Sequence, residues 1–355
     1  MIQTMRFIGL MSGTSLDGLD VVYVDIREDF TFDLLAARTY PYPELWAAIL
    51  SSLEKASAYD YALANVRLGH YMGEKVREFI AEKQIDAVDY IASHGHTIFH
   101  QPHLGLTTQI GDGDAIAAET GIPVISNFRT LDVALGGQGA PLVPIGDRLF
   151  FAQYQACLNL GGIANISYEE GPKGRVAYDI CPCNMALNNL ARRMGKDYDR
   201  DGLTARGGAV VPSLLETMES LEFYRTPAPK SLGKEWFVES FLPLLQDDYA
   251  TADLLRTTVE HEALRVASVL NEKEIKKLLV SGGGAYNKFL IERIVALAPQ
   301  CEVTIPDPSL IEYKEAIIFA LLGYLRITQQ TNTLSSVTGA RCDSIGGVLS
   351  GLCQG

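Results

Sequence analysis

The sequence lacks an apolar run long enough to cross a membrane. Its longest such stretch, Ala316–Leu325, falls well short of the roughly 20 residues that a membrane-spanning helix needs. The first residues also lack a basic segment followed by an apolar core, so we expect no signal peptide. Together these absences predict a cytoplasmic protein with no membrane partner.

Positive charge is scarce as well, because 30 Lys and Arg against 43 Asp and Glu give a formal net charge of -13. Nucleic acids and anionic membranes bind through basic patches, so we expect neither as a partner. The six cysteines show no paired spacing typical of a zinc site or a disulfide scaffold. With 355 residues, 47% of them hydrophobic, the chain is long enough for two globular domains.

No G-x-x-x-x-G-K-[ST] phosphate loop occurs, but glycine-rich turns follow three strand-like runs. Such turns expose several backbone N–H groups at once and bind phosphate. Turns so far apart in one chain predict a nucleotide held between two lobes. Asp17 or Asp20 would order a water bound to Mg²⁺. The expected nucleotide contacts are the Ser12 hydroxyl, Gly13, Thr14, Ser15, Leu16, Asp17, Gly18, Leu19 and Asp20, then Asn159, Gly161 and Gly162, then Gly282, Gly283, Gly284 and Asn287.

Both halves of the chain begin with a strand, a glycine turn and a second strand, which predicts a duplicated fold. Residues 21–26 are expected to pair back on residues 6–10 as a hairpin. Residues 130–144, rich in Gly, Gln and Pro, are the best candidate for the crossing between domains. We therefore expect one lobe from residues 1–130 with about 330–355, and a second from residues 131–330. Helices are predicted over residues 43–55, 61–83, 114–120, 185–194, 212–221, 252–272, 287–297 and 315–329.

Four of the six histidines lie within Ser93–His103. On a strand His94 and His96 point to the same face, a spacing seen at metal sites, so a zinc hydrolase is one alternative. However, no Asp, Glu or Cys between His94 and His103 completes a ligand set. In the other interpretation these imidazoles donate hydrogen bonds to a sugar or phosphate, or lie on a loop.

Three further residues suit catalysis or substrate binding. Asp179 ends an apolar strand-like run and precedes a helix, a favoured place for a general base, although a structural Asp near a helix start would look similar. Glu315 opens the last predicted helix, either as a second catalytic carboxylate or as a favourable charge at a helix N-terminus. Arg129 suits bidentate binding of a carboxylate, although surface arginines are common in loops.

The sequence contains, in order over nearly its whole length, the segments Gly9–Gly18, Asn127–Leu142, Leu158–Asn165, Gly282–Asn287, Lys314–Ala316 and Val337–Arg341. These segments resemble the anhydro-N-acetylmuramic acid kinases, and they are too long to match by chance. The resemblance implies an α/β chain with the two-lobed actin-like ATPase (ribonuclease-H-like) fold, which has duplicated mixed sheets and a central ATP cleft.

The resemblance also implies a reaction in peptidoglycan recycling. The enzyme would open the 1,6-anhydro ring of 1,6-anhydro-N-acetylmuramic acid with water and phosphorylate O6 from ATP with Mg²⁺, giving N-acetylmuramic acid 6-phosphate and ADP. Asp179 would take the proton of the water, with Glu315 as the second catalytic carboxylate. Arg129 would bind the lactyl carboxylate, and His96 and Thr97 would contact the sugar. The sequence does not determine the oligomeric state, and a homodimer is one candidate.

One segment departs from the family pattern. The family usually reads Asp-Thr-Gly-Pro-Gly-Asn around the catalytic aspartate, whereas this chain reads Asp-Ile-Cys-Pro-Cys-Asn over residues 179–184. Loss of two glycines restricts the backbone of the turn, and two thiols near the reactive centre suggest sensitivity to oxidation. We interpret the change as a subfamily variant that keeps activity. The alternatives are a kinase of the same superfold acting on another sugar, the zinc hydrolase, and an ATPase scaffold without a small-molecule substrate.

Overall fold

The chain forms two compact units. The computed structural model describes residues 4–13, 16–228, 230–246 and 248–351. One unit comprises Met1–Phe150 with Tyr313–Gly355, and the other comprises Phe151–Glu312. Among the described residues, no helix combines the length and the apolar character that crossing a membrane requires.

Residues 131–150 and 313–330 therefore belong to the first unit, whereas the sequence pattern assigns them to the second lobe. Side-chain packing explains the difference. The ring of Phe150 lies 4.4 Å from that of Phe32, and Lys314 forms a buried ion pair with Asp147 at 2.7 Å. The Gly- and Pro-rich segment is thus part of the first unit, and the crossing follows it.

The first unit is built on a mixed sheet in which β1 pairs antiparallel with β2 and parallel with β4. The strand order is β12-β6-β4-β1-β2-β3, with β5 paired to β4. The hairpin expected from the first glycine turn is confirmed, since Leu10 pairs with Val21. The elements of this unit are β1 (Thr4–Ser12), β2 (Leu19–Arg27), β3 (Phe32–Tyr40), α1 (Glu44–Ser52), α2 (Ala58–Lys83), β4 (Tyr90–Gln101), β5 (Leu106–Ile110), α3 (Gly113–Thr120), β6 (Val124–Ser126), α4 (Thr130–Ala134), α5 (Pro144–Phe150), most of α12 (Pro308–Ile327), α13 (Ser335–Thr338) and β12 (Val348–Ser350).

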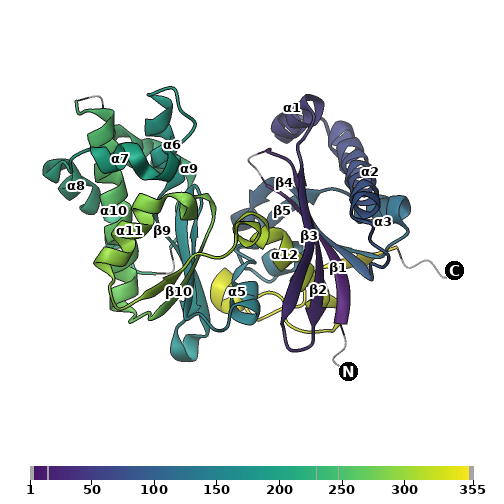
Figure 1. Cartoon of the computed structure of the whole chain (residues 1–355). Coiled ribbons are helices and arrows are strands. Elements are labelled where there is room, and N and C mark those ends of the chain that lie inside the picture. Colours follow the sequence, from purple (N-terminus) through teal and green to yellow (C-terminus); the bar gives the residue numbers. More distant parts are fainter. Residues whose placement is uncertain (1–3, 14–15, 229, 247, 352–355) are drawn as a thin grey trace. The chain divides into compact units, whose positions relative to one another are not determined.

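The second unit repeats this arrangement in a sheet ordered β11-β10-β7-β8-β9. Here β7 is antiparallel to β8 and parallel to β10, as β1 is to β2 and β4. The duplicated α/β fold with two mixed sheets is therefore confirmed (Figure 1). The elements are β7 (Ala156–Leu160), β8 (Ile163–Glu169), β9 (Arg175–Pro182), α6 (Asn184–Arg192), α7 (Leu203–Gly207), α8 (Pro212–Glu219), α9 (Lys234–Trp236), α10 (Thr251–Glu272), β10 (Lys277–Ser281), α11 (Lys288–Leu297) and β11 (Glu302–Thr304).

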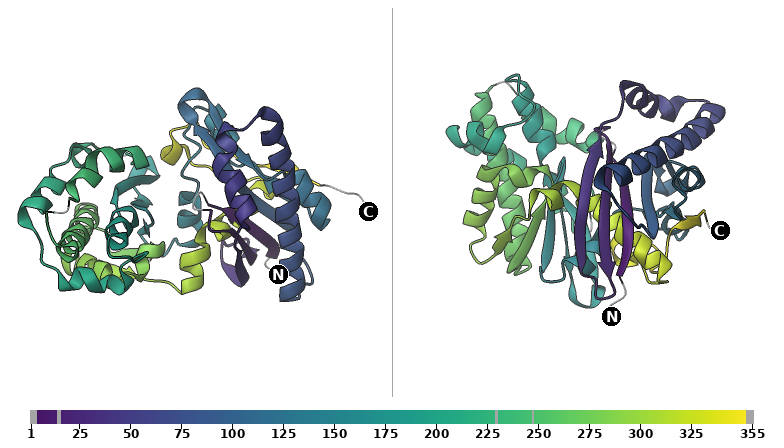
Figure 2. Two further views of the ribbon diagram at one scale, coloured as in Figure 1. Left: turned by 90° about the horizontal axis from the view of Figure 1, so that it is seen from above. Right: turned by 45° about the vertical axis from the view of Figure 1, so that its right-hand side comes forward.

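In the first unit, α2 runs along one face of the β1–β3 strands (Figure 2). It begins three residues before the predicted start, because the side chain of Ser57 caps it by accepting a hydrogen bond from the backbone N–H of Asp60. Leu68 and Met72, four residues apart, join Ile8 and Leu10 of β1 in one buried core.

The opposite face of β1 packs on α12. Successive residues of a strand point to opposite faces, so Phe7 and Gly9 point away from α2. The ring of Phe7 contacts Tyr324 of α12, with centroids 6.3 Å apart. A Cβ on Gly9 would lie 2.2 Å from the backbone oxygen of Ala316. The first glycine of the turn motif is therefore required by packing.

We expect Gly9→Ala to lower the free energy of unfolding of the first unit by about 1–3 kcal/mol, since backbone atoms must shift to admit the methyl group. The measurement is denaturant unfolding. Gly207→Ala, in the second unit, is the control, because no atom outside its chain neighbours and its own helix backbone lies within 4 Å of the added Cβ. It should change stability by less than about 0.5 kcal/mol. Equal effects of the two substitutions would contradict the packing argument.

Candidate active site

Two hydrogen-bonded side chains, Ser12 and His96, lie where the parallel pairing of β1 with β4 ends. Ser12 Oγ and His96 Nδ1 lie 2.8 Å apart and both residues are buried. The Tyr42 hydroxyl donates to Ser12 Oγ at 2.7 Å. The Ser12 hydroxyl, expected to bind phosphate, is therefore engaged within the protein. Thr97 follows on β4, where its Oγ1 accepts a 3.4 Å hydrogen bond from Gln109.

Arg129 is held beside these residues by His94. Nδ1 of His94 lies 2.9 Å from the backbone oxygen of Gly95, which makes Nδ1 the donor and leaves Nε2 as an acceptor. Arg129 donates to that Nε2 through Nε at 3.1 Å and Nη2 at 2.9 Å. A third N–H, on Nη1, donates to the backbone oxygen of Gly139 at 2.7 Å. Because a guanidinium has five N–H groups, one remains on each terminal nitrogen, and these could bind a carboxylate.

The electrostatics agree with a neutral histidine. Burial, with a smaller contribution from the charge on Arg129, lowers the pKa of His94 to about 3, so its ring is neutral at pH 7. Burial lowers the pKa of Arg129 to about 10, which leaves it charged, and Glu315 partly offsets this shift. The pair thus offers a fixed positive charge.

Glu315 lies in the third turn of α12, which begins at Pro308. The expectation that Glu315 opens this helix is wrong, and so is its interpretation as a charge at a helix N-terminus. Its side chain is open to solvent, yet the protein atoms around it desolvate the carboxylate and raise its pKa. Arg129 and Lys314 oppose that shift, while Asp20 adds to it. Glu315 therefore lies within electrostatic reach of both Arg129 and Asp20.

The first glycine turn is described only in part. Thr14 and Ser15 lie outside the described residues, whereas Gly13, Leu16 and the remainder of the turn are described. Asp17 is exposed, and Asp20 on β2 accepts a hydrogen bond from Thr39 at 2.6 Å. Mg²⁺ typically takes one or two carboxylates together with phosphate oxygens, so these oxygen donors fit that ion.

The histidine segment does not form a metal centre. Gly95 has a φ of 73°, which kinks β4 between His94 and His96. His94 contacts Arg129 and His96 contacts Ser12. In the described part of the chain, no group of three or more His, Cys, Asp or Glu side chains could hold a metal ion. The geometry therefore favours binding of polar groups over metal ligation.

The second unit brings two glycine turns together at the ends of β7 and β10. Asn159 pairs with Ser281 in the parallel register. Gly282 has a φ of 79°, and a Cβ on it would lie 2.5 Å from Oδ1 of Asn159. The Gly161-Gly162 turn follows directly, and its two carbonyls accept the N–H groups of residues 183–185.

Asn287, the last residue expected to contact the nucleotide, caps a helix. Its Oδ1 accepts the backbone N–H of Leu290 at 3.1 Å in the first turn of α11. That bond gives the Asn287 side chain a structural role at the start of the helix. Gly283 and Gly284 lie in the short 3₁₀ segment before it.

A β-bulge separates Asp179 from the core. Asn165 pairs with Asp179 while the preceding Ala164 pairs with Cys181, so Ile180 is an extra residue on β9. Without this insertion, Asp179 and Cys181 would point to the same face. With it, Cys181 joins the hydrophobic core, whereas Asp179 is only partly buried.

Two backbone groups hold Asp179. Its own N–H donates to the backbone oxygen of Lys230 at 3.0 Å, and its Oδ2 accepts the N–H of Leu232 at 2.7 Å. Burial raises the pKa of Asp179, and the bond from Leu232 partly opposes that shift. A carboxylate with a raised pKa is a stronger base, as a general base requires. Sequence reasoning did not identify Lys230 and Leu232, because they lie about fifty residues away with no spacing that links them to Asp179.

Comparison with known proteins shows which family this chain resembles. A sequence model of the anhydro-N-acetylmuramic acid kinase family matches residues 5–351. A protein named anhydro-N-acetylmuramic acid kinase from Actinobacillus pleuropneumoniae serotype 3 is 37% identical, over 94% of this chain and 96% of its own. One of the same name from Sulfurovum sp. is 38% identical, over 97% and 98%.

The chain belongs to the anhydro-N-acetylmuramic acid kinase family. Among solved structures, the activator of 2-hydroxyisocaproyl-CoA dehydratase from Clostridium difficile is similar with a TM-score of 0.45 and 13% identity, over 92% of this chain and 97% of its own.

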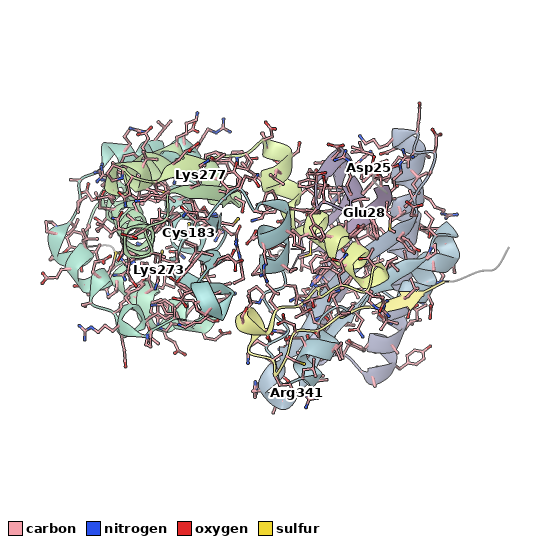
Figure 3. The ribbon with its side chains drawn as sticks, turned by 90° about the horizontal axis from the view of Figure 1, so that it is seen from below. Asp25, Glu28, Cys183, Lys273, Lys277 and Arg341 are labelled. Atoms are coloured by element: carbon pink, nitrogen blue, oxygen red, sulfur yellow. The ribbon has the colours of Figure 1, made fainter. Side chains whose placement is uncertain are left out.

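This kinase-family chain has two cysteines, Cys181 and Cys183, in the turn after Asp179. The buried carboxyl group of Glu262 lies near both of them. Cys181 and Cys183 have no exposed surface, and Cys183 lies inside the second unit (Figure 3). Glu262 of α10 is also buried, and burial raises its pKa well above the usual value, while the nearby Cys183 thiol partly opposes the shift. Burial therefore favours the protonated form of Glu262 in the folded protein.

We expect Glu262 to make this kinase-family chain less stable as pH rises. A raised folded-state pKa means full stability below the unfolded value, about 4.3, and a loss of up to about 1.4 kcal/mol per pH unit above it. Glu262→Gln should flatten this dependence, as measured by unfolding at a series of pH values. The control is Glu216→Gln at an exposed position of α8. A slope that survives Glu262→Gln would exclude this carboxyl as its source.

Proposed function

We propose that this chain is an ATP-dependent kinase that opens the 1,6-anhydro ring of 1,6-anhydro-N-acetylmuramic acid and phosphorylates O6. The products are N-acetylmuramic acid 6-phosphate and ADP. Membership of the family supports the activity. The main observation that supports the chemistry is the position of Asp179. The pKa of its carboxylate is raised, and the backbone of Lys230 and Leu232 holds it by two hydrogen bonds. The cellular role that we infer is recycling of peptidoglycan sugars in the cytoplasm.

In the proposed reaction, Asp179 accepts a proton from water as the water oxygen bonds to C1 of the sugar. The C1–O6 bond breaks, and O6 keeps its electron pair. O6 then bonds to the γ-phosphorus of ATP, and the bond from that phosphorus to the bridging oxygen breaks to release ADP. The anhydro ring thus supplies an oxygen that gains negative charge where a phosphoryl group neutralises it. Positioning and charge neutralisation supply most of the remaining catalysis.

Each unit supplies its own share of the proposed machinery. In the first, Gly13–Asp20 would contact the ATP phosphates, while Arg129, His96 and Thr97 would bind the sugar, with Glu315 as the second catalytic carboxylate. In the second, the adjacent turns at 161–162 and 282–284 would contact ATP. Asp17 and Asp20 would hold Mg²⁺, which neutralises phosphate charge.

Asp179→Asn should leave ATP binding intact and reduce kcat by a factor on the order of 10²–10⁴, because an amide cannot take the proton of the water. Steady-state kinetics with the anhydro sugar and calorimetric ATP titration provide the two measurements. Asp197→Asn makes the same chemical change at an exposed position and should leave both quantities unchanged. Turnover near the wild-type rate in Asp179→Asn would place the base elsewhere.

Arg129→Lys should raise KM for the anhydro sugar about tenfold to a hundredfold, since lysine cannot replace the planar pair of N–H groups. KM for ATP should not change. The control is 1,6-anhydro-N-acetylglucosamine, which lacks the lactyl carboxylate and should be equally poor with either enzyme. If Arg129→Lys weakened both sugars to the same extent, Arg129 would not be the carboxylate site.

The same assays separate the remaining alternatives. Preference for a simple hexose would favour another sugar kinase. Stoichiometric zinc after purification, with activity that a chelator abolishes and Mg²⁺ fails to restore, would favour a zinc hydrolase. The contacts of His94 and His96 argue for the kinase.

A further inference from the structure

A polar chain in the core of the second unit leads to the segment that holds Asp179. Three of its members are Tyr224, His261 and Glu219, from the 3₁₀ segment Glu222–Arg225, α10 and the end of α8. The helices α8 and α10 are neighbours (Figure 1). His261 has no exposed surface, so its two ring nitrogens can bond only to protein groups.

The direction of each hydrogen bond in this chain follows from charge. His261 Nδ1 lies 2.5 Å from Glu219 Oε1, and Arg265 Nη1 lies 2.9 Å from Glu219 Oε2. Burial raises the pKa of Glu219, but the bonds to His261 and Arg265 outweigh burial and lower it, so Glu219 is a carboxylate and accepts. Nδ1 of His261 is therefore the donor. Burial lowers the pKa of His261, so the ring is neutral and Nε2 accepts the Tyr224 hydroxyl at 2.8 Å.

Tyr224 is joined in turn to the segment 230–232. Lys230 Nζ donates to the backbone oxygen of Phe223 at 2.8 Å and lies 4.3 Å from the centre of the Phe223 ring. Phe223 is the neighbour of Tyr224, so the position of the tyrosine determines where this acceptor lies. The backbone of Lys230 and Leu232 then makes the two bonds to Asp179.

Packing alone does not account for these polar groups. Trp236 and Phe241 surround Tyr224 and His261, with ring centroids 6.5 Å and 5.6 Å apart for the pairs Trp236–Tyr224 and Phe241–His261. Apolar residues of similar volume would pack there without the cost of burying a carboxylate and an imidazole. A fully hydrogen-bonded chain, in contrast, selects a single arrangement of the elements that it joins.

We propose that Tyr224, His261 and Glu219 are positioning residues that fix Phe223 and, through Lys230 and Leu232, the carboxylate of Asp179. The proposal rests on the proposed function only in assigning Asp179 as the base. None of the three side chains needs to touch the substrate.

The test uses Tyr224→Phe, which keeps the ring and removes the hydroxyl that bonds to His261. Hydrogen exchange at the amides of Asp179 and Leu232 should become at least about tenfold faster, while amides of β7 and β10 keep their rates. In the kinase assay kcat should fall about tenfold to a hundredfold, because small displacements of a catalytic group have effects of this size. KM for ATP should not change. His261→Gln is a second variant of the same chain and should act in the same direction.

The control is Val266→Ala, five residues after His261 on α10, which removes methyl groups from the same core at a side chain that makes no hydrogen bond in the polar chain. It should lower the melting temperature while leaving kcat and both amides near wild type. Unchanged exchange at Asp179 and Leu232 in Tyr224→Phe and His261→Gln would overturn the proposal. If the wild-type protein phosphorylated no anhydro sugar, the proposed function would fail, and the exchange rates would still decide whether these residues hold Asp179.

Discussion

Parallel pairing at the centre of each sheet is the constraint on which the site depends. Because β1 runs parallel to β4 and β7 runs parallel to β10, the ends of each pair meet at one edge of the sheet. That geometry brings Ser12 to His96, which is 84 positions later, and Asn159 to Ser281, which is 122 positions later. Glycines let the backbone pack closely here, since a Cβ on Gly9 would overlap the backbone oxygen of Ala316 and one on Gly282 would overlap the side chain of Asn159.

Burial then decides which side chains near these strand ends carry charge. His94 is neutral because its surroundings disfavour the imidazolium, and a neutral Nε2 can accept from Arg129. A protonated ring would instead repel the guanidinium and leave two of its N–H groups without an acceptor. The same logic applies in the second unit, where a neutral His261 lies between a carboxylate and a hydroxyl. In both places a buried histidine orients another functional group.

The sequence predicted the parts of this structure that local pattern determines. Alternation of strand and glycine turn indicated the hairpins, and the family segments indicated the fold and Asp179. The pattern could not place what depends on tertiary contacts. The start of α12 was missed because Pro308 and Ser309 begin a helix before the strongly apolar run, which moved Glu315 to the third turn. The kink at Gly95 and the bulge at Ile180 each change the direction in which a neighbouring side chain points. The alternation of apolar and polar residues in the sequence does not predict such single-residue irregularities.

The two cysteines after Asp179 show how a departure from the family pattern can be accommodated. Cys183 has a φ of −130°, so this position does not need the left-handed backbone conformation that favours glycine. Burial raises the pKa of both thiols well above the ordinary value, which keeps them protonated. A thiol that is neither ionised nor accessible reacts slowly with oxidants, so the structure argues against the oxidation sensitivity that the sequence suggested. Instead, the structure buries both thiols in the core of the second unit, where the Cys183 thiol and the Glu262 carboxyl each shift the pKa of the other.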